Sequence, residues 1–284
     1  MSTVDQFESV FKAAAKATYS HEASSISNAL VATDLEGAEA NFFLQATKGF
    51  LAEAAPETDW RLLEGKDFVG SRGLLDKVEE IRPDLTVTYR HLKSESWRWP
   101  YGLGGCLDVL TQATPNSVLV LPHPENAVAA ERLNHPPKEV MAVSGHLGDD
   151  HQLIRLAIHF TANQGRLTLS HVEDQATFDR YLDAISKIPE IDTEVAKECI
   201  LERLLDDARD YAEAVRSEVE KRDMIMEVIG LVKVGRRLSD YSEMVEAGKV
   251  DLLVMNAKDE DQMAMHGMVV QKLLNSLKPI QLLD

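Results

Sequence analysis

The chain repeats itself, and this repetition limits the folds it can adopt more than any other feature. Residues 28–54 resemble residues 139–165, because each begins with a short apolar run, passes through a turn and ends in a helical apolar pattern. Residues 83–122 resemble residues 250–283, since each reads as a strand, a long loop, a glycine, an amphipathic helix and a second strand. Strands that alternate with helices predict a parallel sheet covered on both faces, and two copies predict two such sheets.

A polar stretch with four prolines, residues 122–139, separates the two copies. Clusters of proline and polar residues are typical of linkers rather than of helices or strands. We therefore predict a first domain over residues 1–124, a linker over residues 125–138 and a second domain over residues 139–284.

The two copies differ in length. The second contains a long helical pattern from about Thr193 to Arg222, with Asp192 as a plausible N-cap and a mixture of charges that predicts a solvated face. The first copy lacks this stretch and has lost about one strand–helix unit. Residues 4–19 form an extra amphipathic segment with Phe7 and Phe11 on its apolar side, and we hypothesise that it covers the sheet surface left by the lost unit.

Charge and composition exclude several classes of function. The net charge of −17 argues against a nucleic acid or an anionic membrane as partner, because either would add repulsion between like charges. The sequence has no apolar run near the ~20 residues of a membrane span, and its N-terminus lacks the pattern of a secretory signal. Its two cysteines, Cys106 and Cys199, are far apart, which favours a reduced, cytoplasmic setting.

The second copy carries the stretches "VMAVSGHLGDDHQLIRLAIHFTANQGRLTLSHVED" and "VEAGKVDLLVM", followed by "GMVVQKLLNSLKPIQLL". In these stretches the chain resembles the universal stress protein family in a tandem two-domain form, and the resemblance covers most of residues 28–122 and 138–284. It implies an α/β fold of two tandem adenine-nucleotide alpha-hydrolase-like domains, each a parallel sheet of about five strands flanked by helices, the first one shortened. Many members dimerise through the last strand. The resemblance therefore implies that the two domains pair through strands 117–121 and 279–283, and it leaves a further homodimer open.

Nucleotide-binding members of the family resemble one another in two features. An aspartate ends the first strand, and a loop with the pattern G-x-x-G, some nine residues, then G-[ST] wraps the phosphates, because glycines let backbone amides approach phosphate oxygens. In the second copy these positions are degenerate, and they are Ser144, Asn256, Asp259, Gly267 and Met268. Three carboxylates in residues 259–261 would also oppose a phosphate chain. We predict that the second copy has lost the ligand.

The first copy keeps more of the pattern. If ATP binds anywhere in this chain, the resemblance places it here, with the candidate residues Asp34, Arg90, Lys93, Gly104 and Gly105. The loop 89–105 adds Arg98 and the aromatic residues Trp97, Trp99 and Tyr101. Cations and aromatic rings at the end of a parallel strand could hold another anionic or flat ligand. Alternatively, the aromatic side chains fill a shortened domain.

The remaining polar residues predict neither catalysis nor a metal. His146, Asp149, Asp150 and His151 follow a strand, but the two histidines do not share one helix face, so we expect an aspartate to cap the helix and the histidines to be solvated. His159 and His171 lie in apolar segments and are expected to be structural. We identify no catalytic residue and no metal ligand.

Three functions remain open. The first is a tandem universal stress protein that acts in stress response or protein interaction rather than as an enzyme, with degenerate nucleotide sites and protein partners of unknown identity. The second is an ATP-binding switch or weak ATPase that uses the first domain. The third is a binder of another small molecule at the loop 89–105.

Overall fold

The computed structural model describes residues 18–94, 103–125, 131–145, 147–148, 150–189, 191–256 and 280–283. The first half contains β1 (Asn28–Ala32), α2 (Gly37–Phe50), β2 (Asp59–Leu63), the short helix η1 (Gly65–Asp67), α3 (Gly70–Ile81), β3 (Leu85–Tyr89), α4 (Gly105–Ala113) and β4 (Ser117–Leu121). The second half contains η3 (Glu131–Asn134), β5 (Glu139–Val143), α6 (His151–Phe160), β6 (Gly165–Asp174), α7 (Gln175–Ile185), α8 (Thr193–Lys221), β7 (Met226–Gly235), α9 (Arg237–Gly248), β8 (Leu252–Met255) and β9 (Ile280–Leu283).

The strands of the described residues form one nine-stranded sheet in the order β2-β1-β3-β4-β9-β8-β5-β6-β7. Within each half the strands are parallel. At the junction β9 pairs in parallel with β8 and antiparallel with β4, so that Leu119 lies opposite Leu282. The predicted α/β fold is confirmed, and the first half has one strand fewer than the second.

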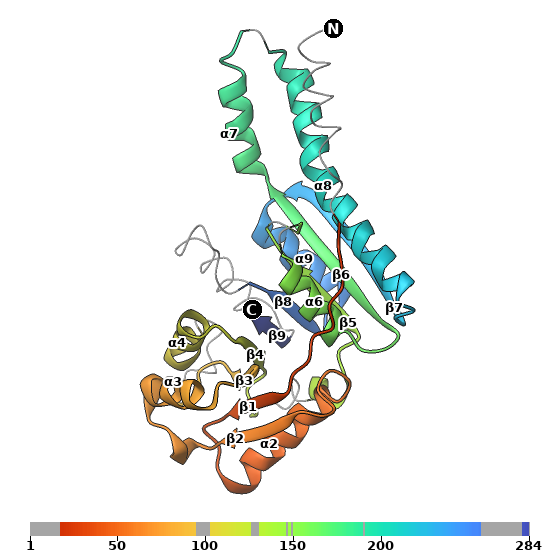
Figure 1. Cartoon of the computed structure of the whole chain (residues 1–284). Helices are drawn as coiled ribbons and strands as arrows, with labels where there is room; N and C mark the ends of the chain where they lie inside the picture. The colour runs from red at the N-terminus through yellow and green to blue at the C-terminus, as the bar shows by residue number, and fades with distance from the viewer. Residues whose placement is uncertain are drawn as a thin grey trace.

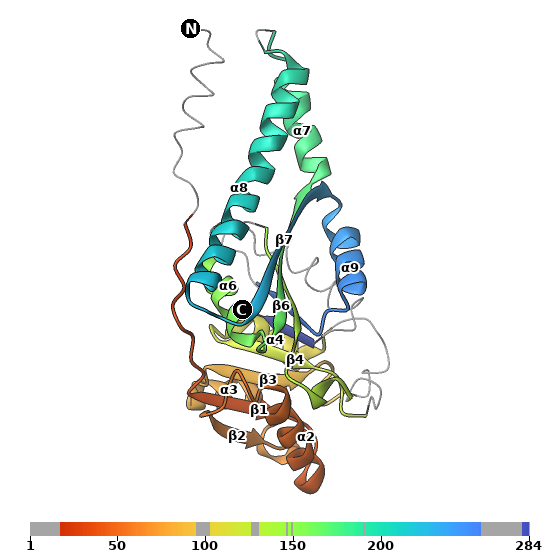
Figure 2. The ribbon, with the colours of Figure 1, turned by 90° about the vertical axis from the view of Figure 1, so that its right-hand side faces the viewer.

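Helices cover both faces of the sheet. In Figure 1, α2 lies on one side of the first half, and α3 and α4 lie together on the other side. In Figure 2, α6 and α8 lie on one side of β6 and β7, and α9 lies on the opposite side. Because both faces are covered, every residue of β3, β4 and β8 is buried, and most of these residues are apolar.

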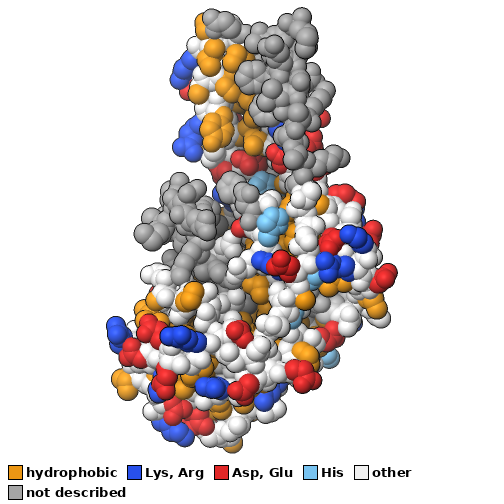
Figure 3. Space-filling model, viewed as in Figure 1, with side chains coloured by type: hydrophobic (Ala, Val, Ile, Leu, Met, Phe, Trp, Pro, Cys, Tyr) orange, Lys and Arg blue, Asp and Glu red, His pale blue; other side chains and the backbone are white. Residues whose placement is uncertain are grey.

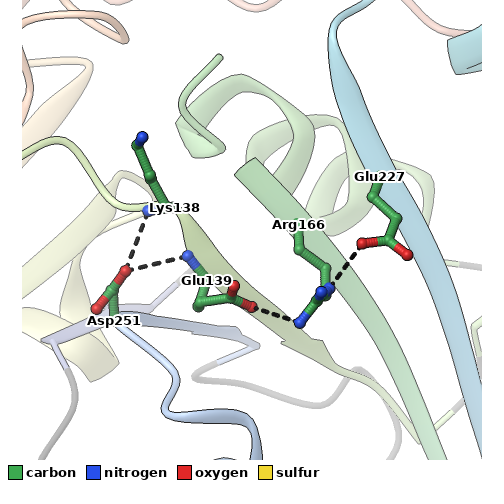
Figure 4. Close-up of polar contacts among 5 residues, drawn as sticks. All are labelled: Lys138, Glu139, Arg166, Glu227 and Asp251. Atoms are coloured by element: carbon green, nitrogen blue, oxygen red, sulfur yellow. Dashed lines mark hydrogen bonds and ion pairs between the residues drawn. The ribbon is translucent and has the colours of Figure 1, made fainter. Parts of the chain in front are cut away.

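The two halves also share one detailed contact. In each half an aspartate directly before a central strand makes the same pair of hydrogen bonds. The carboxylate of Asp84, which precedes β3, accepts hydrogen bonds from the N–H groups of residues 27–28 at 2.8 and 3.0 Å. The carboxylate of Asp251, which precedes β8, accepts from the N–H groups of residues 138–139 at 3.1 and 3.0 Å, as Figure 4 shows. The sequences "PDL" and "VDL" therefore perform the same task, which is to fix the start of the neighbouring strand.

Helix α7 and the first half of α8 project from the second half as a two-helix arm (Figure 1). The predicted N-cap of α8 is confirmed, because the carboxylate of Asp192 accepts from the N–H groups of Glu194 and Val195 at 3.0 and 3.3 Å. Only residues from Ala208 onward are buried in α8, where it packs on β7 and β6. We call residues 175–207 the arm; its first helix, α7, was not expected from the sequence.

Most of the amphipathic segment 4–19, with Phe7 and Phe11, lies outside the described residues. The described stretch that follows contains no helix between Thr18 and Ser27. It begins on the second half, where Tyr19 is buried against α8, and runs to the first half, where the carbonyl of Ile26 accepts a hydrogen bond from Thr58 at 2.6 Å. Among the helices of the described residues, none is long and apolar enough to cross a membrane.

Candidate functional site

The carboxyl ends of parallel strands are where α/β proteins place their ligands, so the site is built from the residues that follow β1 and β3. Asp34 follows β1, and its carboxylate accepts a hydrogen bond from the hydroxyl of Tyr89, the last residue of β3. The other carboxylate oxygen accepts from the backbone N–H of Lys93 at 2.7 Å. The aspartate that the sequence singled out is thus engaged by two groups of its own chain.

Tyr89 holds this cluster together from inside the protein. Its side chain is fully buried, with the ring edge-to-face against Phe43 and His123 at centroid distances of 5.3 and 4.9 Å. Its hydroxyl also lies 2.8 Å from Oγ1 of Thr33 and accepts from the N–H of Asp34 at 3.0 Å. Burial, followed by the bond to the nearby carboxylate, raises the pKa of Tyr89, so the phenol keeps its proton and donates it.

The ammonium group of Lys93 points back into the first half. It donates to the carbonyl oxygen of Gly65 and, at 2.7 Å, to that of Phe68, and it lies 4.5 Å from the centroid of the Phe68 ring. These contacts tie the loop after β3 to the loop after β2. Arg90, another expected anion ligand, is half-buried, and burial lowers its pKa. Lys93 is exposed, but its ammonium is held by backbone carbonyls, and Arg90 is partly enclosed by the protein.

Gly65 is a residue of this site that the sequence analysis missed. A Cβ at Gly65 would lie 2.5 Å from the carbonyl oxygen of Asp34, so only glycine allows the two loops to approach this closely. Its N–H donates to the carbonyl of Leu35 at 3.1 Å. The only signal in the sequence was a glycine two residues after the apolar pair Leu62 and Leu63, which many turns share.

The two glycines before α4 have different roles. Gly104 has a φ of +87°, and a Cβ there would lie 2.8 Å from Cα of His91. The backbone N–H of His91 donates to the carbonyl of Leu103 at 2.8 Å, which holds the two loops together. Gly105 is the first residue of α4, and a Cβ there would meet no atom within 4 Å. Close packing against His91 is thus sufficient reason for a glycine at position 104.

We expect Gly104→Ala to lower the free energy of unfolding by about 2 kcal/mol, because the added methyl group meets backbone atoms at a positive φ. The matched substitution Gly105→Ala should change stability by less than about 1 kcal/mol, with stabilisation the favoured direction. Urea unfolding of both variants measures the difference. Equal effects of the two substitutions would contradict this account of Gly104.

The corresponding place in the second half is closed by Asp150. One carboxylate oxygen accepts a hydrogen bond from the hydroxyl of Ser144, and the other accepts from the side-chain amide of Asn256 at 2.9 Å. Two of the expected degenerate positions are therefore joined through a third residue. Asp150, one of the two aspartates expected to cap the helix, stands at the N-cap position of α6, but its side chain makes no cap hydrogen bond.

The other expected positions of the second half, Asp259, Gly267 and Met268, lie outside the described residues. So do the alternative cap Asp149 and the neighbouring His146. The aromatic and basic part of the loop 89–105, which is residues 95–102, is also outside them, and its role as a ligand site stays a prediction.

The backbone of Ser144 is held by buried groups on its far side. Its carbonyl accepts from the hydroxyl of Tyr241 at 3.3 Å and lies 3.3 Å from Nδ1 of His171. The same hydroxyl accepts from the N–H of Val172 at 3.0 Å, and burial raises the pKa of Tyr241 to about 12. The histidine is buried and has the structural role that we expected.

The remaining histidines also take part in packing. His151 is not merely solvated as expected, since its Nδ1 lies 2.8 Å from the hydroxyl of Tyr211 on α8. His159 packs edge-to-face on Phe160 at 5.4 Å, and burial lowers its pKa. Within the part of the chain that the structure describes, no three His, Cys, Asp or Glu side chains are placed to hold a metal ion.

A groove of about 700 Å³ lies elsewhere, along the starts of β6 and β7 and the end of α8. Arg166 in this groove forms ion pairs with Glu139 at 3.4 Å and with Glu227 at 2.8 Å, which Figure 4 shows as a row across three strands. The groove is at the amino ends of the strands, and Arg166 is neutralised by carboxylates on both sides. It does not correspond to the candidate site after β1 and β3.

The fold defines the class of protein: a tandem pair of parallel α/β units in one chain. In structural comparison the chain is similar to a universal stress protein from Archaeoglobus fulgidus, with a TM-score of 0.53 at 10% identity over 90% of this chain and 97% of that one. It is also similar to a candidate universal stress protein from Pseudomonas aeruginosa, with a TM-score of 0.49 at 12% identity over 91% of this chain and 92% of that one. No family model matches the sequence, and no curated protein matches it. The chain thus has the fold of universal stress proteins.

Proposed function

We propose that this chain is a non-enzymatic tandem universal stress protein, which acts through interaction with protein partners and whose two nucleotide positions are closed by its own side chains. The observation that carries the proposal is the state of Asp34. Each of its two carboxylate oxygens already accepts a hydrogen bond, one from the Tyr89 hydroxyl and one from the N–H of Lys93, so a nucleotide base would have to compete for the acceptor, and freeing either oxygen would require the loop after β3 to move. A ligand would have to supply the free energy for that movement.

The phosphate side of the first half supports the same proposal. The ammonium of Lys93 is held by two backbone carbonyls, and Gly104 is accounted for by its contact with His91. These bonds use two of the three N–H donors of the ammonium and fix its direction, so a phosphate would have to reach the third donor or draw the lysine away from both carbonyls. The residues that best matched the family pattern are thus used by the loop itself.

In the second half a carboxylate lies between two of the positions that the resemblance assigns to ligand binding. Asp150 lies between Ser144 and Asn256, so a negative charge stands where the resemblance would place a nucleotide. A phosphate brought there would be repelled by the carboxylate and would have to break both bonds. This favours a structural rather than a binding role for the second copy.

The absence of an activated nucleophile in the described site supports a non-enzymatic role. Cys106 follows Gly105 in α4, and burial raises the pKa of its thiol, which keeps the sulfur in its less reactive form. Tyr89, the other proton donor at the site, also has a raised pKa. Neither group is set up to act as a base or nucleophile near neutral pH.

We further propose that the two halves form an internal pseudo-dimer through their last strands. The antiparallel pairing of β4 with β9 supports this, because it gives each half a neighbour at an edge that would otherwise be unpaired. The strap formed by residues 18–27 adds contacts on both halves, and the N–H of Asn163 donates to Glu53 across the junction at 2.7 Å.

Calorimetric titration of Mg–ATP into protein freed of co-purified nucleotide tests the proposal. We expect no heat of binding and no rise in unfolding temperature up to millimolar ATP, and no phosphate release above the buffer rate. Because a ligand that binds the folded state at 100 times its dissociation constant would stabilise it by about 2.7 kcal/mol, thermal unfolding is a sensitive second readout.

The variants Asp34→Asn and Asp150→Asn assign the site if wild-type protein does bind. Binding at one site per chain that is lost in Asp34→Asn would overturn the proposal and establish an ATP-dependent switch in the first half. Binding that survives both substitutions would point instead to the loop 89–105. Asp150→Asn is the matched control, since it removes a carboxylate at the corresponding place of the other half.

A further inference from the structure

The arm exposes apolar side chains that a two-helix hairpin cannot bury by itself. Four of them are between 42% and 55% exposed, and they are Tyr181, Ile188, Ile191 and Val195. Figure 3 shows hydrophobic side chains gathered along α7 at the top of the view. Along α8 the residues Ile200, Leu201, Leu204 and Leu205 are only half-buried. Exposed apolar surface of this kind marks a place where another segment packs.

The described chain begins next to this surface. The ring of Tyr19 lies 5.9 Å from that of Tyr211 in edge-to-face contact and 6.1 Å from the ring of His151, and its hydroxyl is 3.2 Å from Nδ1 of His21. Nearby, Arg155 of α6 pairs with Glu22. Residue 19 is thereby fixed at the base of the arm, on the side where α8 leaves the sheet. The 17 residues before Thr18 start their course from this point.

The sequence of that segment matches the arm in pattern and length. Val4, Phe7, Val10, Phe11 and Ala14 recur at helical spacing. From Tyr211, at the base of the arm, to Thr193 the helix α8 runs for 18 residues, which is about 27 Å, and a helix over residues 4–16 would span about 20 Å. A helix that starts beside Tyr211 and follows α8 therefore covers much of the exposed side without reaching beyond the tip.

Charge favours residues 1–17, rather than the arm of a second copy of the chain, as the segment that covers this surface. Residues 175–210 contain ten acidic and five basic side chains, a net charge of −5, whereas residues 1–17 contain two of each. Two arms would repel each other, but the neutral segment would not. If the segment keeps the register set by Tyr19 and Tyr211, Lys12 and Lys16 lie beside residues 204 and 208, next to Asp207 and Asp210.

We propose that residues 4–16 form an amphipathic helix that docks along the arm, parallel to α8, and completes a three-helix bundle. The segment's attachment at Tyr19 gives it a millimolar effective concentration at the arm, which a separate partner would have to exceed. This assigns the segment to the second half, whereas the sequence alone suggested a cover for the shortened first half. Displacing the segment would expose the arm for a protein partner.

Cross-linking to the native Cys199 tests this placement. Cys199 is exposed on the arm, while Cys106 is buried and protected from reagents. In the proposed register position 7 lies beside residue 199, so Val10→Cys, one turn away and on the apolar side, should form an intrachain cross-link with a short bismaleimide. The matched control Ser9→Cys places the thiol on the opposite side of the helix and should react at least several-fold less.

Hydrogen exchange of the intact chain supplies an independent readout. Phe7→Ser combined with Phe11→Ser should increase deuterium uptake in residues 188–205 at least several-fold, whereas Glu8→Gln on the polar side should leave it unchanged. Equal cross-linking of the two cysteine variants, cross-links only between chains, or uptake that is unaffected by the double substitution would each overturn the proposal. Cross-links between chains would identify a second copy as the occupant.

Discussion

Leu282→Pro is expected to lower the free energy of unfolding by at least about 3 kcal/mol, the largest effect of the substitutions considered. Residue 282 lies in β9 opposite Leu119 of β4 and Val254 of β8. Since β9 has a paired strand on each side, proline removes a ladder hydrogen bond whichever neighbour the N–H faces, and its ring disturbs the pairing. Urea unfolding followed by circular dichroism measures the change.

The control for this substitution is Leu282→Val, which shortens the side chain but keeps the N–H group and a good strand propensity. We expect Leu282→Val to lower the free energy of unfolding clearly less than Leu282→Pro does. If β4 and β9 hold the halves together, Leu282→Pro should also separate unfolding into two transitions, one for each half. A single transition with a loss below about 1 kcal/mol would show that the junction does not depend on β9.

Tyr89→Phe should destabilise the protein by about 2 to 4 kcal/mol, because it removes a hydroxyl that bonds to both the carboxylate and the N–H of Asp34. Hydrogen bonds to charged groups are the stronger kind, and the buried hydroxyl of Thr33 also loses its partner. Thermal and urea unfolding report the loss.

Tyr241→Phe in the second half is the natural comparison. Its hydroxyl bonds only to neutral backbone groups, the carbonyl of Ser144 and the N–H of Val172, so we expect a smaller loss of about 1 to 2 kcal/mol. A double-mutant cycle of Tyr89→Phe with Asp34→Asn should show coupling above about 1 kcal/mol. Purely additive effects would mean that the hydroxyl and the carboxylate of the first half act independently.

The strands that are buried on both faces could be predicted from the sequence. The runs "NALVA", "LTVTY", "SVLVL" and "LLVM" are the strands β1, β3, β4 and β8, because a strand between two helix layers consists mostly of apolar residues. The long helix α8 was placed within one residue at its end, since its N-cap and its periodicity are local signals. Local patterns were sufficient to predict an element whose signals lie within its own residues, such as a strand that is buried throughout or a helix with its own cap.

The arm and the hydrogen bonds that close the two candidate sites could not be predicted from local sequence patterns. Helix α7 buries only one side chain, Phe178, and the sequence analysis assigned no element to it. The bonds that close the sites join residues that are 55 positions apart in the case of Asp34 and Tyr89, and 106 apart in the case of Asp150 and Asn256. No local spacing reports such a contact.

The sequence by itself determined the alternation of strands and helices, the tandem repetition and the loss of a unit from the first copy, because hydrophobic periodicity and helix caps act over a few residues. Only the tertiary structure decided what the polar residues at the strand ends do. Asp34 and Lys93 looked like ligand residues, yet their charges are taken up by Tyr89 and by the carbonyls of Gly65 and Phe68. The same side chain can hold a ligand or a loop, and the choice depends on which groups the packing of distant segments brings within hydrogen-bonding distance.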